Sequence, residues 1–456
     1  MLFFKFLMND VLSQPSVLVG LVALIGLLAQ KKPVEQIITG TIKTIIGFLI
    51  LSGGANIVVG SLSHFGTMFQ KGFNITGVVP NNEAIVALAI QTIGSQTALI
   101  MACGMAVNIL LARFTKFKYI WLTGHHTFYM ACMLAAILLA AGFKGISLVV
   151  AGSILLGITM VIFPALAQPI MKQITGSEDV AFAHFGTIGY ILSGYIGKYI
   201  GDKSKSTEDI KMPKGLTFLR DNTVAIGTTM MLVYVITALF AGKGYVEKEL
   251  SGGMNYLVFS ILQALTFSAG VYVILAGVRM ILGEIIPAFR GIALKIVPNA
   301  KPALDCPVVY PYAPTAVLIG FLSSFLAGIV GMFILIAMKA TVIIPGVVPH
   351  FFCGATAGVF GNAMGGRRGA VIGSFAHGLL ITFLPVWLMP VLGNLGFANT
   401  TFSDADFTVT GIITGNVARF FGSTGIYILI IVLLLVLFIP SFSKRYVDTA
   451  KSQKTV

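Results

Sequence analysis

The sequence predicts an all-α polytopic membrane protein with about eleven transmembrane helices, some of them broken or re-entrant, and an inverted internal repeat. Of its 456 residues, 57% are hydrophobic and only 10% are charged, whereas about a quarter of the residues of a soluble domain are charged. Apolar stretches of about 20 residues, enough to cross a hydrocarbon core, recur along the whole chain. Lipid is therefore the expected solvent, and residues 1–456 are expected to form a single membrane domain.

Eleven stretches are apolar enough to be interpreted as membrane spans. They lie near residues 15–30, 37–62, 86–112, 120–141, 146–170, 224–241, 255–283, 313–338, 342–362, 369–392 and 421–440. We identify no removable signal peptide before the first stretch, so it is expected to be the insertion signal. The four cysteines are widely separated and suggest no disulfide framework.

The basic residues predict the orientation in a cytoplasmic membrane. With the N-terminus outside, 21 Lys and Arg residues fall in cytoplasmic loops and tail, and 7 fall on the other side. This excess follows the positive-inside rule, and it places the C-terminus in the cytoplasm. The net charge of +14 is spread over short loops. It forms no basic helix face, so we expect no nucleic-acid partner.

Two pairs of short segments suggest an internal repeat. GTIKTIIG at 40–47 resembles AGVRMILG at 276–283, and WLTG at 121–124 resembles IIPG at 343–346. Five predicted spans separate the two copies, so the copies would have opposite orientations in the membrane. Chance similarity among Gly- and Ile-rich helices is the other explanation.

Three segments interrupt the apolar stretches and are expected to break helices: 52–56, 77–84 and 351–366, which are rich in Gly, Asn or Pro. Glycine allows close backbone approach and positive φ. The backbone amides at the start of a helix can bind oxygen-rich ligands. In membrane helices, glycine also serves simple close packing, and that interpretation stays open for each single position.

Five ionisable residues lie at the ends of predicted spans beside such segments: Glu83, His125, His126, His184 and Asp305. An unpaired charge in hydrocarbon costs several kcal/mol, so such residues are candidates for a function. An imidazole and a carboxylate together donate to and accept from hydroxyl groups, which suits a sugar or polyol. A histidine that is merely hydrogen-bonded in the core remains the alternative. The chain has no Walker A, HExxH or GxSxG motif, so we expect no enzyme active site.

Several of these segments together carry a family resemblance. They are GTIKTIIGF (40–48), LTGH (122–125), ALDC with YAP (303–306 and 312–314), IIPG (343–346) and GVF with GG (358–366). In this order and spacing they resemble the membrane component, IIC, of the phosphotransferase system (PTS) for L-ascorbate, the UlaA family. The similarity extends from about residue 15 to residue 440.

The resemblance implies a homodimeric permease of a bacterial inner membrane, in which each subunit combines a scaffold with a mobile core. The scaffold spans correspond to about 15–62 and 224–283, and the solute-binding core corresponds to about 77–200 and 305–440. The resemblance also implies that the solute is phosphorylated during uptake by separate cytosolic IIA and IIB proteins. No catalytic residue, cofactor or metal is expected in this chain.

Two cytoplasmic segments are expected to contact IIB. The first is the largest predicted loop, 171–220, and the second runs from Arg290 to Lys301.

The solute-binding positions that the resemblance implies are Gly53, Gly54, Asn82, Glu83, His125, Tyr129, His184, Phe185, Asp305, Ala355 and Thr356. Four of them differ from the ascorbate transporters. Asn82 and Glu83 stand where a Thr-Tyr pair is expected, and Tyr129 and Phe185 stand where glutamines are expected. An ascorbate anion would be repelled by an ionised Glu83, whereas a neutral sugar or polyol would not.

Two other function classes stay open at this point. An ion-coupled secondary transporter would use Glu83, His125, His184 and Asp305 as a proton relay. A channel or structural membrane assembly would bind no solute stoichiometrically. The chemical form of the accumulated solute distinguishes these classes, because only the phosphotransferase route phosphorylates it.

Overall fold

The computed structural model describes residues 15–74, 77–210, 222–397 and 400–441. Helices make up most of this part of the chain. They are α2 (Pro15–Ala29), α3 (Val34–Phe73), α4 (Asn82–Phe114), α5 (Gly124–Ala140), α6 (Gly145–Thr175), α7 (Thr187–Ile200), α8 (Asn222–Ala241), α9 (Lys243–Tyr245), α10 (Tyr256–Lys295), α11 (Pro314–Ala337), α12 (Val347–Arg368), α13 (Ser374–Leu388) and α14 (Ala405–Phe438). Each of the eleven apolar stretches in the sequence coincides with one of these helices.

Several helices are long and apolar enough to cross a membrane, which confirms the polytopic class. Within the described residues, five segments meet both criteria, and a sixth does so if a bent pair is counted as one span. The five are Thr92–Phe114, Gly145–Thr175, Pro314–Ala337, Val348–Val391 and Ala405–Ser441. The bent pair joins Met230–Ala241 to Lys243–Leu250 at 99°. The break falls at Gly242, whose φ of 89° favours glycine.

Helix breaks occur in two of the three segments where the sequence predicts them. The segment 77–84 contains strand β1 (Val79–Pro80) and the start of α4. The prediction of a break at 52–56 is wrong, because α3 is helical from Val34 to Phe73 and packing along α10 outweighs the low helix propensity of glycine. In 351–366 the helix breaks at Gly365 and Gly366, whose backbone angles are not helical, at the end of the predicted segment.

The expectation that 171–220 is one large loop is also wrong. Residues Thr187–Ile200 form α7, which packs against α12 and α13 and buries Tyr190 and Ser193. The glycines of this helix allow the contact. A Cβ at Gly197 would lie 2.7 Å from the carbonyl oxygen of Gly361 in α12, so only glycine permits this approach. At 14 residues, α7 is too short to cross a membrane, and its apolar pattern was therefore missed.

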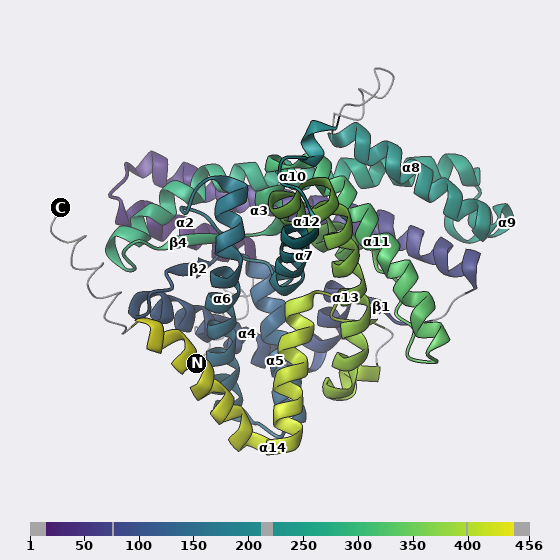
Figure 1. Cartoon of the computed structure of the whole chain (residues 1–456). Helices are drawn as coiled ribbons and strands as arrows, with labels where there is room; N and C mark the ends of the chain where they lie inside the picture. Colours follow the sequence, from purple (N-terminus) through teal and green to yellow (C-terminus); the bar gives the residue numbers. More distant parts are fainter. Residues whose placement is uncertain (1–14, 75–76, 211–221, 398–399, 442–456) are drawn as a thin grey trace.

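The helices pack in two groups. In Figure 1, α3, α8 and α10 run across the top of the view, whereas α6, α13 and the first part of α14 run down it, and α14 turns back at the bottom. The helices α2, α3, α8 and α10 contact one another, and their shared core contains Phe65, Tyr234 and Phe267. The second group has a larger core between α4, α5, α6 and α14, which includes Trp121 and Phe407.

Short parallel strands connect the two halves of the chain. Strand β4 (Lys301–Leu304) lies between β2 (Tyr119–Trp121) and β3 (Ala181–Phe182). Strand β1 pairs with β5 (Thr400–Thr401), and the preceding residue forms a bridge to residue 343. Successive residues of a strand point their backbone N–H and C=O groups to opposite sides. Residue 78 pairs with residue 343 on one side and β1 pairs with β5 on the other, so β1 lies between them. Each half of the chain thus supplies a strand that lies between segments of the other half: β4 between β2 and β3, and β1 between residue 343 and β5.

Candidate functional site

Three histidines and two aspartates converge where these strands end. His125 and His126 lie in the first turn of α5, which follows β2, and His184 follows β3. Asp305 directly follows β4, and Asp404 precedes α14. Because β2, β3 and β4 are parallel neighbours, their carboxyl ends meet at one edge and bring these side chains together.

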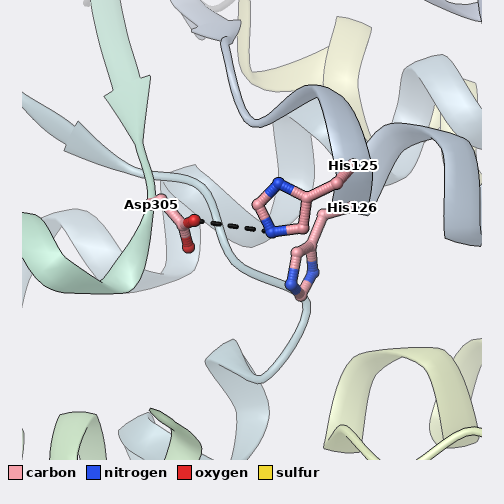
Figure 2. A group of neighbouring side chains, drawn as sticks. All are labelled: His125, His126 and Asp305. Atoms are coloured by element: carbon pink, nitrogen blue, oxygen red, sulfur yellow. Dashed lines mark ion pairs between the residues drawn. The ribbon is translucent and has the colours of Figure 1, made fainter. Parts of the chain in front are cut away.

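The ring nitrogens point toward the carboxylates. The His125 Nε2 atom lies 3.5 Å from Asp305 Oδ2, and Figure 2 shows the aspartate facing the two histidines of α5. The His184 Nε2 atom lies 4.0 Å from Asp305 Oδ1 and 3.8 Å from Asp404 Oδ2. The His126 Nε2 atom lies 4.0 Å from the same Asp404 oxygen. Three of these four separations exceed a direct hydrogen bond.

Asp404 is held by the start of α4. Its Oδ1 atom accepts a hydrogen bond from Asn82 Nδ2 at 2.9 Å and one from Ser403 Oγ at 2.5 Å. The Asn82 carbonyl oxygen in turn accepts the Ser403 N–H at 3.0 Å. Both ends of the Asn82 side chain are therefore used, and the carboxylate is oriented with Oδ2 toward the histidines.

The hydrogen bonds of His126 fix its tautomer. Its Nδ1 atom accepts the backbone N–H of Phe185 at 3.3 Å, so this nitrogen carries no proton. In the neutral ring the proton is then on Nε2, facing Asp404. A second proton would go on Nδ1 and would face the N–H group of Phe185, so this contact keeps His126 neutral.

His184 is oriented from α7. Its Nδ1 atom lies 2.7 Å from the Tyr190 hydroxyl, and its ring packs on His126 with centroids 3.9 Å apart. The start of α7 is capped from the other half of the chain. The buried Asp406 carboxylate accepts the N–H groups of Thr187 and Ile188, each at 2.8 Å. This cap fixes the position of the helix that follows His184.

Exposure differs across the cluster. The side chains of His125 and Asp305 are 26% and 20% exposed. Those of His126, His184 and Asp404 are 4–5% exposed. His125 and Asp305 therefore form the exposed end of the cluster, and Asp404 lies at its buried end.

Comparison with known proteins decides the family. Residues 10–406 match the family model of the PTS system sugar-specific permease component, EIIC-GAT. The chain belongs to this family. It is also 29% identical over 423 residues to an "Ascorbate-specific PTS system EIIC component" of Mycoplasma pneumoniae, a match that covers 80% of this chain. The chain spans 63% of the length of that relative.

Within this permease, the other predicted binding positions lie at varying places around the cluster. Tyr129 contacts it, with its ring 5.8 Å from that of His125. Phe185 is fully buried and stacks on Trp121 at 4.2 Å, so its ring is covered in this conformation. Glu83 lies in the first turn of α4, and its side chain is outside the described residues.

The remaining predicted positions of the permease lie on α3 and α12. Ala355 and Thr356 are buried in α12, beside the helix that follows Asp305. Gly53 and Gly54 lie within α3. For the described residues, no hydrogen bond or ring contact joins those two glycines to the histidine cluster.

A metal ion is a poor fit for most of this cluster. Two of the three groups with converging ligand atoms include His126, whose Nε2 atom carries the proton. Ligation would move that proton to Nδ1, opposite the Phe185 N–H. The three groups are His125, His126 and Asp305; His126, His184 and Asp404; and His184, Asp305 and Cys306. Protonated nitrogens beside carboxylates suit hydrogen bonding to a solute better.

Two residues of the site were missed in the sequence. Asp404 and Tyr190 each lie near the start of a helix, after a strand of only two residues. A possible signal was the polar segment TTFSDAD at 400–406 between two apolar stretches. It became informative only once β5 was seen to pair with β1.

Proposed function

We propose that this permease moves a small hydroxylated solute, ascorbate or a related sugar or polyol, across a bacterial inner membrane while the solute is phosphorylated by separate IIA and IIB proteins. We infer the class of solute from the cluster of histidines and aspartates. His125, His126 and His184 face Asp305 and Asp404 across 3.5–4.0 Å. Such alternating donors and acceptors match hydroxyl groups. Phosphoryl transfer would take place on IIB, so this chain is not itself an enzyme.

The strand pairing supports the inverted repeat. Strand β4 from the C-terminal half lies between β2 and β3 of the N-terminal half. In the same way, β1 from the N-terminal half lies between residue 343 and β5 of the C-terminal half. The segments WLTG and IIPG, similar in sequence, each precede a helix: Gly124 begins α5 and Gly346 caps α12. Inverted repeats place the solute where the two halves meet.

The two packing groups support the division into scaffold and core. The group α2, α3, α8 and α10 corresponds to the predicted scaffold at about 15–62 and 224–283. The histidine cluster lies in the other group. We propose eleven spans with the N-terminus outside, and a homodimer formed through the scaffold.

The two predicted IIB-contacting segments meet on one surface. Glu178, in the loop after α6, accepts hydrogen bonds from Lys172 at 2.7 Å and from Lys301 at 3.1 Å. These bonds lower the pKa of Glu178 to about 2, so the carboxylate stays ionised at any physiological pH. The bridge joins the start of β4 to the loop after α6, which supports a common docking surface formed by these two segments.

The test is uptake into proteoliposomes, with the solute analysed chemically. With energised IIA and IIB in the outer solution, on the cytoplasmic face, phosphorylated solute should appear on that side. Removing IIB should abolish it. Accumulation of unmodified solute driven by a pH gradient alone would establish the ion-coupled transporter instead.

A further inference from the structure

We propose that Asp404 is a specificity-determining residue of the solute site, which makes the permease select neutral polyhydroxylated solutes over anionic ones. This inference rests on the proposed transport function and names the class of solute for the same site. It uses Asp404, Ser403 and the tautomer of His126, none of which the family resemblance supplies.

The first step concerns the charge of the histidine–aspartate cluster. Asp305 and Asp404, both from the C-terminal half of the chain, approach the same ring, His184. His126, the other buried imidazole, stays neutral because its Nδ1 atom accepts the Phe185 N–H. Two carboxylates therefore face the solute, and one of the imidazoles next to them cannot offset their charge.

The second step is the hydrogen-bonding pattern. The proton on Nε2 of His126 faces Asp404 Oδ2 at 4.0 Å, which is too long for a direct bond. The same oxygen lies 3.8 Å from His184 Nε2, which is also too long for a direct bond. A hydroxyl oxygen about 2.9 Å from both partners can accept from the imidazole and donate to the carboxylate.

The third step is the rejection of anions. An anionic oxygen can accept from the imidazole, but it has no proton to donate, and it would lie beside the carboxylate with the same charge. Like-charge contacts of this kind are the means by which binding sites exclude a competitor. Asp404 cannot turn away, because Asn82 and Ser403 hold its other oxygen.

Asn82 thereby has a different role from the one expected for it. Its amide donates to Asp404 and accepts from the Ser403 N–H, so it is a positioning residue that acts through Asp404. A substitution at Asn82 should then change selectivity in the same direction as one at Asp404, but less strongly.

The experiment compares dissociation constants of the purified full-length permease for ascorbate and for a panel of neutral pentitols, hexitols and aldoses at neutral pH. Wild type should bind one neutral solute more tightly than ascorbate. Asp404→Asn should shift the ratio of the two constants toward ascorbate by at least about tenfold, or about 1.4 kcal/mol. Glu208→Gln is the matched control. It likewise changes a carboxylate to an amide, at a side chain that accepts the first N–H groups of α11 and does not face a histidine, so it should lower stability without moving the ratio.

An unchanged ratio in Asp404→Asn, or tighter binding of ascorbate than of every neutral solute by wild type, would overturn the inference. A second measurement needs no solute. The chain has six histidines, so the ¹⁵N spectrum of histidine-labelled protein in lipid can be assigned by single substitutions. His126 should be neutral with its proton on Nε2, and a proton on Nδ1 would refute the argument. Neither measurement uses IIA or IIB, so the failure of phosphorylation-coupled uptake would be a separate result.

Discussion

The cap on α7 allows a quantitative prediction. Replacing Asp406 by alanine removes both hydrogen bonds to the N–H groups of Thr187 and Ile188 and leaves these groups buried without an acceptor. A buried N–H group left without an acceptor costs about 1–3 kcal/mol, so the loss of both hydrogen bonds should be about 2–6 kcal/mol. Asp406→Asn keeps one acceptor and should lose about half as much.

The structure supplies a fluorescent reporter for this measurement. Trp121 stacks on Phe185, two residues before the capped helix, and the second of the two tryptophans, Trp387, can be replaced by phenylalanine. Unfolding in mixed micelles, followed by Trp121 fluorescence, should occur at lower denaturant concentration in Asp406→Ala. A difference below about 1 kcal/mol would refute the reasoning, since even a solvent-exposed cap contributes about that much.

Three further predictions concern the ends of the chain and its cytoplasmic face. A tag before Met1 should be accessible from outside and one after Val456 only from the cytoplasm, and protease protection that puts both tags on one side would contradict the eleven-span topology. Glu208→Ala removes the carboxylate that accepts the first N–H groups of α11, so thermal unfolding should show a loss of about 0.5–2 kcal/mol, whereas Glu208→Gln should lose less. The hydrogen bonds from lysines lower the folded pKa of Glu178 to about 2, so its contribution to stability is complete above the unfolded pKa of a glutamate and is lost only as the pH falls toward 2. The effect of Glu178→Gln on the melting temperature should therefore be the same at pH 6 and pH 8. A difference between the two pH values would count against this ion pair.

The sequence predicted the helices well and their interruptions less well. Each of the eleven apolar stretches is helical, because a run of about 20 apolar residues is a strong local signal. The break expected around Gly53 and Gly54 does not occur, since glycine lowers helix propensity by only about 1 kcal/mol and packing along α10 offsets that. Helix α7 was missed because its 14 residues are too few for a membrane span.

The site was predictable only in part, for a similar reason. His125, His184 and Asp305 could be singled out as ionisable residues at the ends of apolar stretches. Asp404 could not, because its role depends on the pairing of β5 with β1, and a strand of two residues has no recognisable pattern. The orientation of Asn82 toward Asp404, rather than toward a solute, likewise follows from contacts between residues 322 positions apart.

Because β4 pairs with β2 and β3, which precede it in the chain, this sheet can form only after β4 has been synthesised. β2 pairs with β4, and about 180 residues separate the two strands along the chain. At the usual elongation rate of 5–20 residues per second, β2 waits about 10–40 s for its partner to leave the ribosome. Until then the edge of β2 is unpaired, and His125 has no Asp305 to face. An N-terminal fragment that stops before residue 301 would therefore be a substrate for membrane chaperones and proteases, whereas the two halves made as separate chains could restore each other.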